Sequence, residues 1–183
     1  MYISRELKHS NIAEYLLYMW QVEDLLRANA LDLDRIKGTI VDRYELTPEQ
    51  REELTQWYAD LIEMMRLEGV GQSGHLQINR NVLIDLTDLH LRLLRDTRFP
   101  YYSAAYYKVL PYIVELRAKG DNRVGELETC MDALYGRWMM QLQQKPIAEE
   151  TAEALKSIAT FMGMLSEYYN QDRAGTLFAQ QEV

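Results

Sequence analysis

The stretch Ile-Asn-Arg-Asn-Val-Leu-Ile-Asp-Leu-Thr-Asp-Leu-His-Leu-Arg-Leu-Leu-Arg-Asp, residues 78–96, decides the fold class. On a helical wheel its polar residues form one narrow stripe, which consists of Asn81, Asp85, Asp88, Arg92 and Arg95. Apolar residues spaced by three and four positions indicate an α-helix rather than a strand. Because the apolar arc covers more than half of the circumference, the helix should contact neighbours on several sides. The segment is therefore predicted to be the buried central helix of an all-α protein.

The helical spacing of apolar residues continues along most of the chain and predicts a single-domain helical bundle of about seven helices. The expected helices cover about residues 10–29, 33–44, 48–68, 78–96, 103–119, 124–144 and 146–170. The clearest start lies at Thr47, where Thr47 and Gln50 can form a capping box around Pro48. Pro111 predicts a kink or a break one turn earlier. The domain should span residues 1–171, and residues 172–183 should form a loosely ordered tail.

The composition is that of a globular protein, with 183 residues that are 48% hydrophobic and 26% charged. A net charge of -8 argues against nucleic acid as a partner, because binding to phosphates usually requires a basic surface. Arg92, Arg95 and Arg98 come closest to a basic stripe. They lie at a helix end, where the helix dipole favours cations, so their placement is explained without nucleic acid.

The sequence also predicts a cytoplasmic, soluble protein. Its one cysteine, Cys130, has no partner for an internal disulfide, which suits a reducing compartment. The first residues contain no apolar run typical of a signal peptide. No uncharged stretch approaches the roughly 20 residues needed to span a bilayer, so no membrane association is expected.

Two ionisable residues occupy apolar helical faces. Glu23 lies among the apolar residues of the first expected helix, and His90 lies in the apolar arc of residues 78–96. A buried carboxylate must be paired, hydrogen-bonded or protonated, which allows either a pocket or a structural bond to an arginine, a tyrosine hydroxyl or a helix end. If Glu23 and His90 face each other, they could form an acid–base pair. With Tyr102 and Tyr106 they make up the candidate pocket.

No complete metal, cofactor or nucleophile site is predicted. Asp85 and Asp88 resemble half of the paired acidic sites of helical nucleotide pyrophosphohydrolases, but no second acidic pair is evident, and Asp88 is spaced for an exposed ion pair with Arg92. Glu6 and His9 match one half of a di-iron pattern, and three histidines are too few to complete it. Phosphate-binding loops, dinucleotide fingerprints and nucleophile elbows are lacking.

Tyrosine is abundant, with 13 residues, and it is concentrated in the expected helix 103–119 and just before it. Tyr102 and Tyr106 share the apolar face of that helix, whereas Tyr101 and Tyr112 lie off it. Tyrosine combines apolar area with a polar tip and suits half-buried surfaces and interfaces. This pattern favours either a groove or dimer interface or ordinary helix packing. Methionines expected at the edges of helices are Met139, Met140 and Met164.

Three segments carry a resemblance to a known family. They are NIAEYLLYMWQVED (11–24), HLQINRNVLIDLTDLHLRLL (75–94) and FPYYSAAYYKVLPYIVELRAK (99–119). Together they resemble the uncharacterised family called domain of unknown function 4924, found in gut Bacteroidetes. The resemblance covers nearly the whole chain and implies an all-helical cytoplasmic protein, without implying any activity, cofactor or catalytic residue. Ala148 stands where a Ser or Asp helix cap would be expected.

Two functional hypotheses follow. The leading one is a non-catalytic interaction or scaffold-type helical bundle that associates with itself or with a protein partner through a face rich in tyrosine and methionine. The alternative is a small-molecule binding protein or enzyme, with a pocket between the first, fourth and fifth expected helices that contains Glu23, His90, Tyr102 and Tyr106. The sequence leaves open whether the protein is an enzyme, and it favours a protein without catalytic activity.

Overall fold

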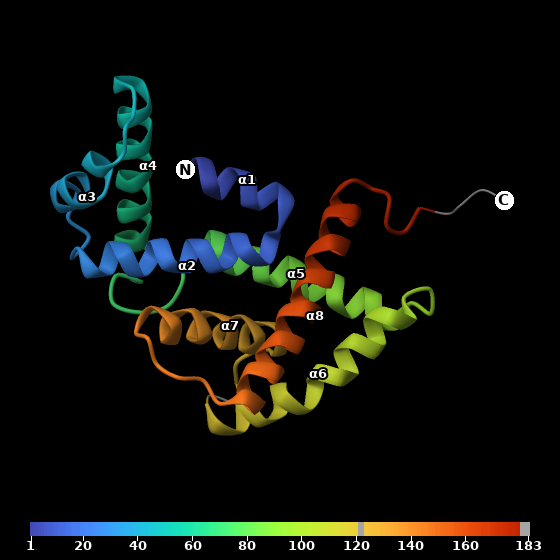
Figure 1. The fold of residues 1–183 in the computed structure, drawn as a ribbon. Coiled ribbons are helices and arrows are strands. Elements are labelled where there is room, and N and C mark those ends of the chain that lie inside the picture. Colours follow the sequence, from blue (N-terminus) through green and yellow to red (C-terminus); the bar gives the residue numbers. More distant parts are fainter. Residues whose placement is uncertain (121–122, 180–183) are drawn as a thin grey trace. The chain divides into compact units, whose positions relative to one another are not determined.

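The computed structural model describes residues 1–120 and 123–179, and within these ranges the chain is helical and contains no strand (Figure 1). The helices are α1 (Tyr2–Ser10), α2 (Ile12–Ala28), α3 (Leu33–Thr39), the 3-10 helix η1 (Val41–Arg43), α4 (Pro48–Leu67), α5 (Gln77–Arg95), α6 (Pro100–Lys119), α7 (Glu126–Leu142) and α8 (Glu149–Arg173). The predicted all-α, single-domain fold class is confirmed, with eight α-helices rather than about seven among the residues described.

The best-defined helix start is the one predicted at Thr47. The Thr47 side chain accepts a hydrogen bond from the backbone N–H of Gln50, and the Gln50 side chain accepts one from the backbone N–H of Thr47. Together with Pro48 in the first turn, these bonds form the capping box of α4. The helix ends at Leu67, and Gly69 just beyond it has a φ of +70°, a left-handed conformation that glycine adopts without steric cost.

Several boundaries differ from the sequence predictions for local reasons. The additional helix α1 is separated from α2 by Asn11, whose side chain accepts a hydrogen bond from the backbone N–H of Glu14 at the start of α2. The expected helix 33–44 is shorter, because α3 ends at Thr39 and η1 follows. Of the kink or break expected one turn before Pro111, the break is absent, since α6 is one continuous helix through that residue, and the kink stays a prediction.

The chain divides into two compact units. The first comprises Met1–Glu6 and Tyr18–Asn81, and the second comprises Leu7–Leu17 and Val82–Val183. Within the first unit, α3, η1 and α4 pack against one another. Within the second, α6, α7 and α8 lie side by side (Figure 1). The buried residues of α8 include Leu155, Ile158, Met162, Leu165 and Tyr169, which are spaced by three and four positions.

Helix α5 is buried along a narrower stripe than its composition suggests. The buried residues of the stripe are Asn79, Val82, Leu86, Leu89, His90 and Leu93. The opposite side exposes the predicted polar residues, but also two large apolar ones, Ile84 (55% exposed) and Leu91 (43% exposed). The helix therefore contributes to the core through one face and presents the other to solvent.

The described part of the predicted tail makes contacts. Leu177 is buried, and the ring of Phe178 lies 5.6 Å from the ring of Phe99 in an edge-on arrangement. The guanidinium of Arg92 lies 4.9 Å from the Phe178 ring. The last four residues, 180–183, and the predicted loop residues Asp121 and Asn122 lie outside the described residues. That residues 172–183 are loosely ordered stays a prediction.

Candidate functional site

Glu23 is a fully buried carboxylate that binds the start of α5. Its Oε1 atom accepts hydrogen bonds from the backbone N–H of Leu76 at 3.0 Å and from the side-chain amide of Asn79 at 2.7 Å. Its Oε2 atom lies 2.6 Å from Nδ1 of His75, and because a carboxylate only accepts, the Nδ1–H group donates. Three donors from residues 75–79 therefore hold the Glu23 side chain of α2. One of them is the backbone N–H of Leu76, which no carbonyl of α5 could satisfy.

The imidazole of His75 is held on two sides. Its ring stacks on the indole of Trp20, with 4.1 Å between the ring centroids and an interplanar angle of 14°. Its side chain is 26% exposed, and its Nδ1 atom is already engaged by Glu23. A carboxylate that orients an imidazole in this way can support proton transfer. The Oδ1 atom of Asn79 is buried without a hydrogen-bond partner among the described residues.

The loop before α5 is also bound by Arg27. The guanidinium of Arg27 donates to the carbonyl oxygen of Val70 at 3.1 Å and to that of Gly74. It also pairs with Asp24 at 2.7 Å. Together, Arg27 and Glu23 fix both the loop and the first residue before α5, which gives the polar residues on this side of α2 a structural role.

His90 lies in an aromatic cluster of the second unit. Its Nδ1 atom and the Tyr102 hydroxyl form a 2.6 Å hydrogen bond, and its ring packs edge-on against Tyr106 and Phe161 at centroid distances of 4.9 and 5.9 Å. Burial lowers the pKa of His90, against a smaller opposing effect of Glu126. The histidine is therefore a neutral core residue whose polar atom is satisfied by a tyrosine.

Two further acidic groups in this cluster are held in their neutral forms. The Tyr106 hydroxyl donates to Oε2 of Glu126 at 2.8 Å, and burial followed by this hydrogen bond raises the pKa of Tyr106 to about 12. Burial, with a smaller contribution from Glu126, raises the pKa of the Cys130 thiol to about 12. At neutral pH both groups remain protonated, so neither is an activated nucleophile.

Three of the four predicted pocket residues are thus brought together, namely His90, Tyr102 and Tyr106. The hydrogen bonds of Glu23 go instead to His75, Leu76 and Asn79, and none of these partners was anticipated as a site residue. Of the structural partners considered for Glu23, the helix end is the one found. The acid–base pair and the four-residue pocket stay predictions.

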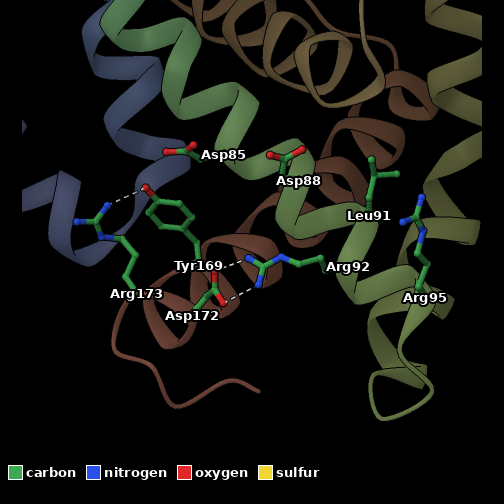
Figure 2. A pocket seen from close by; sticks show the side chains of 8 residues that line it. All are labelled: Asp85, Asp88, Leu91, Arg92, Arg95, Tyr169, Asp172 and Arg173. Atoms are coloured by element: carbon green, nitrogen blue, oxygen red, sulfur yellow. Dashed lines mark hydrogen bonds and ion pairs between the residues drawn. The ribbon is translucent and has the colours of Figure 1, made fainter. Parts of the chain in front are cut away.

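A groove between α5 and α8 lies on the surface of the second unit (Figure 2). It has a volume of about 530 Å³ and is lined by Asp85, Asp88, Leu91, Arg92, Arg95, Tyr169, Asp172 and Arg173. Across it, the guanidinium of Arg92 donates to both carboxylate oxygens of Asp172, at 3.1 and 2.5 Å. This bidentate pair raises the pKa of Arg92 and replaces the predicted ion pair between Arg92 and Asp88.

The remaining charges of the groove are less constrained. Arg173 donates a long hydrogen bond of 3.4 Å to the Tyr169 hydroxyl (Figure 2). Asp85, Asp88 and Arg95 have no hydrogen bond or ion pair within the described part of the chain. The groove therefore offers two carboxylates and one guanidinium that a ligand could bind.

The outward side of α6 carries an exposed arc with helical spacing, referred to below as the outer arc. Its residues are all exposed and comprise Pro100, Tyr101, Ala104, Tyr107, Lys108, Pro111, Val114, Glu115 and Ala118. Tyr101, Tyr107 and Val114 are 81%, 65% and 58% exposed. The opposite side of the helix buries Tyr102, Tyr106, Val109 and Ile113. The tyrosines of α6 thus divide between the core and the surface, with Tyr112 half-buried.

The methionines predicted at the edges of helices are less exposed than expected. Met139, Met140 and Met164 are half-buried rather than fully exposed.

Over residues 1–120 and 123–179, no three His, Cys, Asp or Glu side chains gather closely enough to hold a metal ion. Within the same ranges, no helix combines the length and the apolar character that crossing a bilayer requires.

These features define an all-α protein with a structural polar cluster, a charged groove and an exposed apolar helical arc. Residues 1–176 match the family described as Domain of unknown function (DUF4924), and the chain belongs to that family. No curated protein and no solved structure matches the chain. The resemblance noted from the sequence is therefore confirmed, and the assignment of function rests on the residues themselves.

Proposed function

We propose that this is a non-catalytic interaction protein and that the outer arc of α6 binds a helix of another protein molecule. The observation that carries the proposal is the exposure of Tyr107 and Val114 on one side of a helix whose other side is buried. Full burial of an exposed side chain of this kind contributes about 1.5–3 kcal/mol, so two such residues are a substantial driving force for association.

The spacing of the outer arc supports a helical partner. Ala104, Tyr107, Pro111, Val114 and Ala118 follow one another at intervals of three and four positions. This is the heptad spacing that presents one continuous seam to a facing helix. Lys108 and Glu115 flank the seam on one side, where charged residues of paired helices select the partner and its orientation. The arc therefore suits an amphipathic helix better than an extended strand.

Site-specific photocrosslinking tests the proposal. A photoreactive amino acid replaces Tyr107 on α6 or, as a matched control, Ile84 on α5, which is 55% exposed. Cells that express either variant are irradiated, and adducts of the chain are resolved by mass. We expect a discrete protein adduct from position 107 and none from position 84. Equal or absent crosslinking at the two positions would refute the proposal.

A second function is favoured by the groove between α5 and α8. We propose as the alternative that it binds a small molecule carrying both a positive and a negative group, because Asp85, Asp88 and Arg95 combine both charges and form no hydrogen bond or ion pair among the described residues. Thermal-shift measurements with a panel of zwitterionic compounds test this. A stabilising compound should lose its effect with Asp88→Asn or Arg95→Gln and keep it with the exposed control Asp34→Asn. If no compound stabilises the protein, the alternative is wrong.

We further propose that the protein acts in the cytoplasm. The single cysteine, Cys130, is fully buried, and a chain without a second cysteine gains nothing from an oxidising compartment. Cell fractionation with an antibody against the chain tests the proposal, which fails if the protein is recovered outside the cytoplasmic fraction.

A further inference from the structure

The charges on the outer arc of α6 complement those on the outer arc of a second copy that runs in the opposite direction. Lys108 and Glu115 are seven positions apart on one flank of the apolar seam, and both are exposed. Lys108 has no hydrogen bond or ion pair within the described residues. Glu115 accepts a hydrogen bond from Lys119 one turn further on, in an exposed pair that a new partner can replace.

We propose that the protein forms a homodimer in which the outer arcs of two copies pair antiparallel, with Lys108 of each copy facing Glu115 of the other. This inference rests on the proposed function and names the partner as a second copy of the chain. A two-fold symmetric contact suits it, because each copy then supplies both charges and both ion pairs form at once.

The charges select one register among those that align the apolar seams. In an antiparallel pair, residues on the same flank of the two helices face each other. One register opposes Tyr107 to Pro111 of the second copy and brings the two Lys108 side chains together. The next register along the helix opposes Lys108 to Glu115. Since like charges in contact are unfavourable, the second register is the one that forms.

The favoured register also matches side-chain sizes. It places Tyr107 of each copy opposite the small residue Ala118, and Pro111 opposite Val114. A large residue facing a small one allows two helices to interdigitate closely. The ring of Pro111 adds apolar area at the centre of the contact without presenting an unsatisfied backbone donor. The side chains that are exposed on the outer arc of a single copy thus pack against the outer arc of the second copy in the dimer.

The expected dimer is weak and sensitive to salt. Residues 107–118 span about 18 Å of helix, so the contact falls below the roughly 1,200 Å² that stable interfaces bury. We expect a dissociation constant in the micromolar range and a dimer that dissociates further as salt screens the exposed charges.

Charge reversal tests the register. Sedimentation velocity of the wild-type chain is compared with Lys108→Glu, with Glu115→Lys and with Lys156→Glu, a control that reverses an exposed charge of α8. Each of the first two variants replaces both attractive contacts of the dimer by repulsive ones, so we expect its dissociation constant to rise about tenfold or more. The control should dimerise like the wild type.

Mixing the two variants makes the test specific. Lys108→Glu supplies only negative charges on this flank and Glu115→Lys only positive ones, so an equimolar mixture should form heterodimers although neither variant dimerises well alone. A mass tag on one variant identifies the heterodimer. The double variant Lys108→Glu/Glu115→Lys should recover the wild-type dissociation constant.

Three outcomes would overturn the inference: a wild-type chain that stays monomeric at high micromolar concentration, a dimer unaffected by either reversal, or a mixture that does not associate. Circular dichroism of each variant shows whether it folds, and the mixing experiment separates a folding defect from a lost contact because only folded variants can recover association. A crosslink from position 107 to a different protein would leave the proposed function intact and remove the homodimer.

Discussion

The carboxylate of Glu23 on α2 accepts the backbone N–H of Leu76, the residue that immediately precedes α5. The side chain thus performs for α5 what the Gln50 side chain performs for α4, by accepting the backbone N–H of the residue before the helix, but it does so from a different helix. Because both oxygens of Glu23 are occupied and the residue is fully buried, its removal leaves donors in the core without acceptors.

We predict that Glu23→Ala lowers the free energy of unfolding by about 3 kcal/mol, since breaking a buried charged network costs more than losing one ordinary hydrogen bond. Glu14→Ala, an exposed change on the same helix, should cost much less. Urea unfolding followed by circular dichroism measures both.

A companion variant separates hydrogen bonding from stacking. His75→Phe keeps a ring against Trp20 but removes the Nδ1–H donor, so we expect a loss of about 1 kcal/mol. If Glu23→Ala and Glu14→Ala cost the same, the network does not stabilise α5 and the assignment of a structural role is wrong.

We predict that stability decreases as the pH falls below about 6.5, the ordinary pKa of histidine. Burial lowers the pKa of His90 in the folded state, so below 6.5 the unfolded chain binds a proton that the folded chain does not. The free energy of unfolding then falls with decreasing pH, by up to about 1.4 kcal/mol per pH unit, until the folded-state pKa is reached.

Denaturant unfolding at several pH values between neutral and mildly acidic tests this prediction, with His90→Gln as the comparison. The variant should be less stable at neutral pH and show a shallower pH dependence. Identical pH dependence in the two proteins would show that His90 does not contribute.

The N-terminus of α8 offers a stabilising substitution. Ala148 occupies the cap position with extended backbone angles and forms no side-chain cap hydrogen bond. We predict that Ala148→Ser raises the free energy of unfolding by about 1 kcal/mol, because the hydroxyl can accept an otherwise unpaired N–H of the first turn. Ala159→Ser, in the middle of the same helix, should be neutral or slightly destabilising. Thermal unfolding of the three proteins distinguishes the cap from a general effect of serine.

Cys130 should be unreactive in the native protein. Its thiol is fully buried and its pKa is raised to about 12, mainly by burial, so almost no thiolate exists at neutral pH. We predict that a thiol-specific chromogenic disulfide reacts with one equivalent of thiol only after denaturation. Rapid stoichiometric reaction under native conditions would contradict both the burial and the pKa shift.

The helices themselves could be predicted from the sequence because their signals are local. Periodic apolar residues mark α4 to α8, and the capping box at Thr47 depends on residues three positions apart. The short helix α1 was missed because its apolar residues are few and Asn11 offered an obvious start for α2. A single proline does not distinguish a break from a helix that continues, as α6 does through Pro111.

The polar contacts were harder to predict because their partners are distant in the chain. Glu23 was recognised as a residue that needs partners, yet Leu76 and Asn79 lie 53 and 56 positions away. Likewise, Arg92 has Asp88 one turn away but pairs with Asp172, 80 positions on. A helical wheel also counts apolar residues without showing which have neighbours, so the exposure of Ile84 and Leu91 could not be read from it.

The two ways of starting a helix imply an order of events during folding. The α4 segment carries its own capping box, so its first turn can form while the rest of the chain is still a coil. Leu76, the residue before α5, acquires the acceptor of its backbone N–H only when a loop of more than fifty residues closes, and such closure costs chain entropy before any contact compensates for it. We therefore expect α4 to gain helical structure early and α5 to become fixed late, when α2 is already in place.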